Sequence, residues 1–121
     1  LSARLLLDND ECYQSSAFHC QQTVEKSLKA YILLMTGQLK DGHNLPWLCK
    51  QAMRFESDFS QWLDECAVLN RCYIETRYPT DIPLNLEYKN VLGFYKMAHD
   101  IYIYICGEVD EALDEGNAKK N

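Results

Sequence analysis

Hydrophobic residues recur along most of this chain at steps of three and four, which is the spacing of helices that pack one face against a core. Helix-forming residues run almost unbroken from Glu11 to Thr36, and Gly37 is expected to end that helix. One face of this helix is apolar when each residue turns by about 100°. That face consists of Ala17, Cys20, Val24, Leu28, Tyr31, Ile32 and Met35.

Shorter helices are predicted on both sides of this one. Residues 2–7 form a short apolar stretch, which the polar residues 8–10 bring to an end. Farther along, Asn44 is suited to cap a helix whose first turn tolerates Pro46, and this helix is predicted to reach about Phe55. Because the chain does not start with methionine, we expect the first helix to be incomplete at its N-terminus.

A further helix is predicted to begin at a cap formed by Ser57 or Asp58 and to run toward Thr76. Pro79 stops it, since the residue before a proline is pushed out of helical geometry. The segment RYPTDIPLN, residues 77–85, is then an ordered connection rather than a linker between domains. The apolar face of this helix is Phe59, Trp62, Leu63, Cys66, Leu69 and Tyr73.

The last predicted helix has the most regular pattern. Its aromatic and apolar positions alternate at steps of four and three, as in a seam that packs along another helix. The pattern leaves open whether that helix belongs to the same domain or to a second subunit, and we predict a C2 homodimer. The seam consists of Tyr88, Leu92, Tyr95, His99, Tyr102, Cys106, Val109 and Leu113.

No sustained alternation of apolar and polar residues indicates a strand. The pattern therefore predicts an all-α fold, an antiparallel bundle of four to five helices, in a single domain over residues 1–121. The length of 121 residues, with 47% hydrophobic and 25% charged residues, is ordinary for one such domain.

The charge and hydropathy of the chain restrict the kinds of partner that it is expected to bind. A formal net charge of -6 argues against DNA binding through a broad basic surface, so that any contact with RNA has to be local. No run approaches the roughly 18 consecutive apolar residues of a membrane helix, and no basic region followed by an apolar core opens the chain. We expect a cytoplasmic protein without membrane contact.

The cysteines are read as buried thiols rather than as a disulfide framework. No CxxC pair occurs, and most cysteines sit among apolar residues at helical spacing, which favours a reducing compartment. The spacing supports neither a zinc site nor a redox pair, and we expect no metal and no cofactor. The cysteines are Cys12, Cys20, Cys49, Cys66, Cys72 and Cys106.

A polar row on the long helix is the first candidate binding site. His19, Gln22, Lys26 and Lys29 fall within about 80° of one another, on the side away from the apolar face. Such a row is either a solvated stripe or a site for a small phosphorylated ligand. In the second case the lysines supply charge, and the histidine and amide supply directional hydrogen bonds.

Other candidates stand outside this row. His99 has the chemistry of a general acid or base but also fits a structural role on the seam. His43 either shapes the entry to its helix or contacts a ligand. Arg77, beside Tyr78, could grip a phosphate through its guanidinium, or instead pair with Asp81 or cap the preceding helix. Gly-rich phosphate loops, H-E-x-x-H and G-x-S-x-G motifs are absent from the sequence.

Taken together, the stretches AFHCQQTVEKSLKAY, HNLPWL and RYPTDIP make the chain resemble the HEPN domain family (higher eukaryotes and prokaryotes nucleotide-binding), in the order and approximate spacing of that family. The resemblance implies a helical bundle that is often a homodimer and is frequently encoded beside a small nucleotidyltransferase, in pairs that look like toxin and antitoxin. It also implies a set of ligand-binding positions. These are His19, Gln22, Lys26, Lys29, His43, Arg77, Tyr78 and Asp81.

The catalytic branch of this family implies an RNase site made by an arginine followed, after four to six residues, by a histidine. Counting back from His99, this chain has Leu92, Gly93 or Phe94 at the required positions. We therefore predict a non-catalytic HEPN protein that binds a nucleotide, a nucleotidyltransferase partner or both. One alternative is an RNase toxin that uses His99 with a basic residue such as Lys96, and a second is a purely structural dimerisation module.

Overall fold

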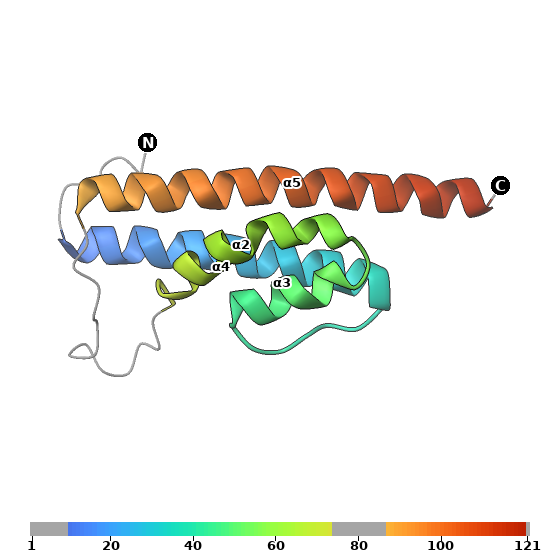
Figure 1. The fold of residues 1–121 in the computed structure, drawn as a ribbon, viewed down its shortest axis with the longest axis horizontal. Helices are drawn as coiled ribbons and strands as arrows, with labels where there is room; N and C mark the ends of the chain where they lie inside the picture. Colours follow the sequence, from blue (N-terminus) through green and yellow to red (C-terminus); the bar gives the residue numbers. More distant parts are fainter. Residues whose placement is uncertain (1–9, 74–86, 121) are drawn as a thin grey trace.

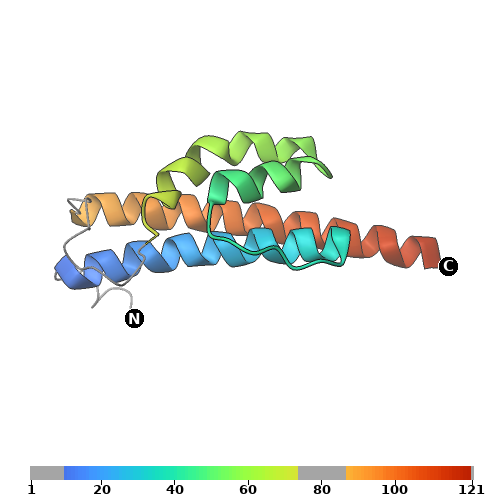
Figure 2. The same cartoon turned by 90° about the horizontal axis from the view of Figure 1, so that it is seen from below.

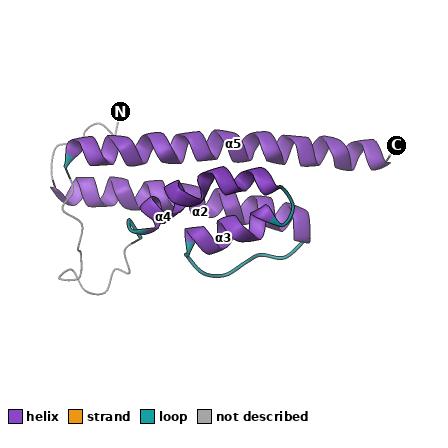
Figure 3. Cartoon of the chain, in the orientation of Figure 1, coloured by secondary structure: helices purple, strands orange, loops and turns teal. Residues whose placement is uncertain are grey.

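The computed structural model describes residues 10–73 and 87–120, and these residues form helices and loops but no strand (Figure 3). The predicted helix over residues 2–7 lies outside the described part of the chain. The all-α fold class is confirmed by the helices packed together here. In chain order they are α2 (Asp10–Thr36), α3 (Leu45–Met53), the 3-10 helix η1 (Ser57–Trp62), α4 (Leu63–Asn70) and α5 (Tyr88–Lys120).

The two long helices, α2 and α5, lie side by side and run in the same direction (Figure 1). α3, η1 and α4 form a shorter layer on one side of this pair (Figure 2). The antiparallel relation expected between neighbouring helices holds for α3 against α4, whereas the long pair is parallel. The connection over residues 37–44 causes this arrangement, because it returns along α2 before α3 begins (Figure 1).

α2 begins and ends close to its predicted limits. Gly37 adopts a φ of 75°, and its N–H donates to the carbonyl of Leu33 at 2.7 Å, which closes the last turn. The predicted apolar face is buried from Ala17 to Ile32. Met35 is an exception, because the last turn of α2 lies beside the C-terminal part of α5, where Met35 and Leu113 line an open pocket.

The start of α3 confirms the predicted cap. The Asn44 side-chain oxygen accepts a hydrogen bond from the Trp47 N–H at 2.9 Å. The next predicted helix is divided in two, because the backbone of Trp62 leaves helical geometry between η1 and α4. Glu56, rather than Ser57 or Asp58, supplies the cap: its carboxylate accepts from the Asp58 N–H at 3.2 Å. α4 then ends at Asn70.

Phe59 lies at the centre of the core and joins the short layer to both long helices. Its ring is fully buried and lies 4.8 Å from the ring of Tyr31 on α2. On the other side it meets the ring of Tyr104 on α5 edge to face, with 5.1 Å between centroids. This aromatic contact holds three segments that are distant in sequence.

α5 packs on the rest of the bundle through a face that the seam pattern did not predict. Its buried residues are Val91, Ala98, Ile101 and Ile105. The Tyr88–Leu113 seam lies on a different side, and its large side chains are mostly exposed. Within the described part of the chain, the seam takes part in packing mainly at its C-terminal end, where Val109 contacts the core and Leu113 lines the pocket beside Met35.

The core thiols give a chemical test of the fold. Cys20, Cys49, Cys66 and Cys72 are buried and not linked by disulfides. Burial raises the pKa of Cys20 to about 11 and the pKa of Cys72 to about 12. Because only the thiolate reacts, we expect alkylation of Cys20 and Cys72 in the native protein at pH 8 to be at least about a hundredfold slower than after unfolding.

Alkylation followed by mass spectrometry of peptides measures these rates residue by residue. Modification of Cys20 or Cys72 within minutes, in a protein that retains its helical circular dichroism, would contradict the packing of α2 against α4.

Candidate functional site

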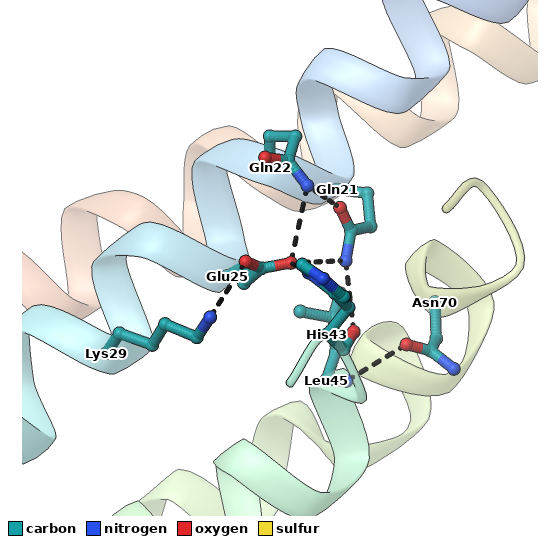
Figure 4. A network of polar contacts seen from close by, with 7 residues as sticks. All are labelled: Gln21, Gln22, Glu25, Lys29, His43, Leu45 and Asn70. Atoms are coloured by element: carbon teal, nitrogen blue, oxygen red, sulfur yellow. Dashed lines mark hydrogen bonds and ion pairs between the residues drawn. The ribbon is translucent and has the colours of Figure 1, made fainter. Parts of the chain in front are cut away.

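A buried carboxylate on α2 organises the polar residues of the molecule. Glu25 is only 4% exposed, yet both of its oxygens accept hydrogen bonds (Figure 4). Lys29, one turn later on α2, donates from Nζ to Glu25 Oε2 at 3.0 Å. His43 Nδ1 lies 2.9 Å from Glu25 Oε1, and because an ionised carboxylate only accepts, Nδ1 carries the hydrogen.

Two glutamines complete this cluster. Gln21, fully buried one turn before Glu25, donates from Nε2 to Glu25 Oε1 at 3.2 Å and to the backbone carbonyl of His43 at 3.1 Å. Gln22 donates to Gln21 Oε1 at 2.7 Å and to Glu25 Oε1 at 3.3 Å. Gln21, Gln22, Glu25, Lys29 and His43 are called the Glu25 network below.

The network fastens the connection between α2 and α3 to the middle of α2. Next to it, the Leu45 N–H donates to the Asn70 side-chain oxygen at 2.9 Å, which ties the start of α3 to the end of α4 (Figure 4). Hydrogen bonds from three segments thus converge at the point where the chain enters α3. The local reason is that His43, directly before the Asn44 cap, is carried back along α2 to the level of Glu25.

The acidity of Glu25 reflects two opposing effects. Burial raises the pKa of the carboxyl, but the hydrogen bonds from His43, Lys29 and Gln21 and the charge of Lys29 lower it, and the net result is a pKa below the ordinary value. Glu25 is therefore ionised at neutral pH. Its charge is compensated by Lys29, so that the network itself contributes no excess negative charge to this surface.

A row of aromatic rings runs beside the network. The His43 ring stacks on the ring of Tyr73 with 4.4 Å between centroids and an interplanar angle of 16°. Tyr73 lies 5.9 Å from Phe18, and Phe18 lies 6.3 Å from His19. The side chain of His43 remains half exposed in this stack, which leaves part of its ring accessible.

The structure separates the predicted polar row into two parts. Gln22 and Lys29 are half-buried and belong to the Glu25 network, whereas His19 and Lys26 are exposed on the outer side of α2. His43, predicted from another segment, joins the first part. Arg77, Tyr78 and Asp81 lie outside the described residues, and their roles stay predictions.

His99 lies apart from the network. It is exposed on α5, and its ring is parallel to the ring of Tyr95 one turn earlier, with 6.2 Å between centroids. Lys96, its suggested partner in an RNase, is also exposed. The RNase alternative stays a prediction, and the sequence itself has no arginine at the spacing that the catalytic branch requires.

Gln21 and Glu25 were not predicted as site residues, although a signal for both was present. With Ala17, Val24 and Leu28 on the core face, Gln21 falls within that face and Glu25 at its edge, at about 100° per residue. Buried polar side chains need hydrogen-bond partners, and a segment other than α2 had to supply some of them. Only the fold shows that the segment is the one containing His43.

The described part of the molecule has no cluster of His, Cys, Asp and Glu suited to a metal ion. Nor does any of its helices have the length and apolar character needed to span a membrane. Together, the parallel long pair, the short layer and the polar network define a helical-bundle protein whose connecting segment is anchored by a buried carboxylate.

Comparison with known proteins gives this bundle a family. The model of the HEPN domain matches residues 2–106, and the chain therefore belongs to the HEPN domain family. No curated protein and no solved structure matches the chain.

Proposed function

We propose that this chain is a non-catalytic HEPN protein that binds a nucleotide at the surface formed by His19, Lys26 and His43. The observation that carries the proposal is the half-exposed His43 ring, which the Glu25 network holds against Tyr73. A preorganised ring offers a face for a base, and preorganisation lowers the entropic cost of binding.

The charges near this surface favour a phosphorylated ligand. Lys29 compensates Glu25, whereas Lys26 forms no ion pair with any residue in the described ranges and keeps its positive charge available. A free ammonium group beside hydrogen-bonding side chains suits a phosphate oxygen. The predicted residues Arg77, Tyr78 and Asp81 would extend the same site, and the proposal includes them as ligand contacts.

The biological setting of this binding is proposed from the family. A non-catalytic HEPN protein fits the role of a partner for a small nucleotidyltransferase in a module of the toxin and antitoxin type. Ligand binding would then make the association depend on nucleotide. The absence of the arginine and histidine pair from the sequence supports binding rather than RNA cleavage.

A titration of the labelled protein with ATP, GTP and a short RNA, followed by backbone amide shifts, tests the nucleotide proposal. We expect saturable shifts that cluster at His19, Lys26 and His43. Lys26→Ala should weaken the affinity by about threefold to thirtyfold, since a charge-assisted contact to phosphate is lost. Lys50→Ala removes an exposed lysine from α3 and should leave the affinity unchanged.

Arg77→Ala in the same titration tests the predicted contribution of the segment over residues 77–85. An absence of shifts up to millimolar nucleotide would contradict the proposal. The partner half is tested separately, by co-expression with a nucleotidyltransferase encoded by an adjacent gene. Failure of the two proteins to co-purify, with and without ATP, would contradict the proposed association with a nucleotidyltransferase.

A further inference from the structure

An apolar groove lies where the last turn of α2 meets the C-terminal part of α5, and it shares no residue with the Glu25 network. Its volume is about 350 Å³. Leu34 and Met35 of α2 and Leu113 of α5 line it, and these side chains are between 37% and 48% exposed. Large apolar side chains that gather at an open surface are typical of an interaction site.

The groove exists because α5 continues past the end of α2. α2 ends at Thr36, whereas α5 runs to Lys120, and in Figure 1 and Figure 2 its last turns extend beyond the other described helices. The side of α5 that packs on the core at Val109 continues, at helical spacing, to Ala112 and Gly116 in the groove. Apart from its own helix turn, no atom lies within 4 Å of the position that a Cβ of Gly116 would take. The backbone of a partner can therefore approach α5 closely here.

Carboxylates stand along one edge of this groove. Glu115 lines it, and Glu108 and Glu111 lie on the same side of α5, at helical steps of three and four. Burial, and then the charges of Glu111 and Glu56, raise the pKa of Glu108, so Glu56 at the start of η1 faces the same place. Among the described residues, no lysine, arginine or histidine forms an ion pair with any of these four carboxylates. Their negative charge is therefore available to a cation from outside.

A buried hydroxyl group faces the same carboxylates. Tyr31 is only 3% exposed, and its hydroxyl forms no hydrogen bond with the described part of the chain. Burial, and then the charges of the four glutamates, raise the pKa of Tyr31 to about 12. A phenol oxygen and carboxylate oxygens all accept hydrogen bonds. An ammonium or guanidinium group at this edge would therefore satisfy acceptors that the described residues leave without a donor.

We propose that the groove binds a basic amphipathic helix of a partner protein. The apolar side chains of that helix enter between Leu34 and Leu113, and its lysine or arginine side chains pair with the carboxylates at the edge. Met35 suits such a contact, because its flexible side chain adapts to different apolar surfaces. An acidic helix would be repelled by the same edge. The inference does not depend on the nucleotide proposal, since the two surfaces have no residue in common.

A labelled synthetic peptide gives the first test. It contains only leucine and lysine over about 15 residues, or four helical turns, with leucine at steps of three and four. We expect saturable binding, measured by fluorescence anisotropy, with a dissociation constant below about 100 μM that rises with salt concentration. A peptide of the same composition in scrambled order should bind at least about tenfold more weakly. Equal affinities of the two peptides would mean that charge alone attracts them, and the proposal would fail.

Filling the groove tests where the peptide binds. Gly116→Trp places a large side chain in the groove, and Gly107→Trp is the matched control. Both glycines are exposed on α5 with open space beside them, but only Gly116 lines the groove. We expect Gly116→Trp to weaken peptide binding by at least about tenfold and Gly107→Trp to change it by less than about twofold. Circular dichroism checks that both variants fold, and equal affinities of the two folded variants would contradict binding in the groove.

The acidic edge is tested by removing charge without changing size. Glu111→Gln combined with Glu115→Gln should weaken peptide binding by about threefold to thirtyfold, because charge-assisted contacts are lost. Asp110→Asn combined with Asp114→Asn removes the same charge from a different side of α5 and should have an effect below about threefold. Equal effects of the two pairs would contradict a specific role of this edge.

Two further measurements identify the occupant. Lys26→Ala, which tests the nucleotide surface, should leave peptide binding unchanged, so that the two proposals succeed or fail separately. Light scattering without peptide should give the same mass for the wild type and Gly116→Trp. A mass that is halved by Gly116→Trp would show that a second copy of the chain fills the groove, and the proposal of a basic partner would then be wrong.

Discussion

Replacing Phe59 with alanine should lower the free energy of unfolding by about 3–5 kcal/mol, the range measured for removal of buried phenylalanine rings. The ring is fully buried and contacts Tyr31 on α2 and Tyr104 on α5. Its loss leaves a cavity at the junction of three segments, and the two remaining aromatic rings lose their common partner. Domains are typically stable by about 5–15 kcal/mol, so this variant should be close to its unfolding threshold.

Urea titration followed by circular dichroism measures this change, and thermal unfolding should show a Tm lower by roughly 10–20 °C. Phe55→Ala is the matched control, because Phe55 is 41% exposed and lies only four residues earlier. We expect it to cost less than about 1 kcal/mol. Equal losses in the two variants would show that Phe59 does not hold η1 to the long helices.

The features that the sequence predicted well depend on contacts between residues close in the chain. Gly37 ends α2 because the last turn needs a positive φ, and Asn44 caps α3 through the N–H of Trp47. The buried face of α2 follows from helical periodicity alone. For these features the local pattern and the tertiary fold favour the same structure.

The predictions that were wrong concern features that are set by contacts between residues distant in the chain. The periodic residues 57–70 form a 3-10 helix and then a short α-helix, because Glu56 provides the cap and Trp62 leaves helical geometry. The direction of the long pair depends on the path of residues 37–44, which no periodicity encodes. The Tyr88–Leu113 seam is regular, but regularity alone could not distinguish a packing face inside the bundle from an exposed one.

The candidate site also depends on contacts between residues distant in the chain. The exposure of His19 and Lys26 follows from helical geometry, and so does the position of Gln21 on the core side and of Glu25 at its edge. The meeting of Glu25 with His43, 18 residues later, depends on the return of the connecting segment along α2. A local pattern could therefore identify the polar residues without showing which of them share a hydrogen-bonding network.

Replacing Glu25 with glutamine tests that network directly. The variant keeps the size of the side chain but loses the charge, and it places an amide N–H₂ where Lys29 or His43 requires an acceptor. Leaving buried polar partners unsatisfied costs about 1–3 kcal/mol each, so we expect a loss of about 2–4 kcal/mol at pH 7. Hydrogen exchange of residues 38–43 should accelerate, because their attachment to α2 is weakened.

The pH dependence of the free energy of unfolding distinguishes the contribution of the Glu25 charge from the contribution of its size and shape. The pKa of this carboxyl is lowered in the folded protein, so the unfolded chain binds its proton more tightly. The contribution of Glu25 is therefore complete above the ordinary carboxyl pKa of about 4.3, and it is lost as the pH falls through the lower pKa of the folded state. Glu25→Gln should lack this part of the acid dependence.

Urea titrations between pH 7 and pH 3 measure this difference, with Glu111→Gln as the exposed control on α5. Parallel stability curves for wild type and Glu25→Gln over the whole range would contradict an ionised Glu25 in the folded state. If the curves instead converge as the pH falls, the charge stabilises the attachment of the 37–44 connection. His43 would then depend on that charge for its place on Tyr73, and ligand binding at this surface should weaken in the same pH range.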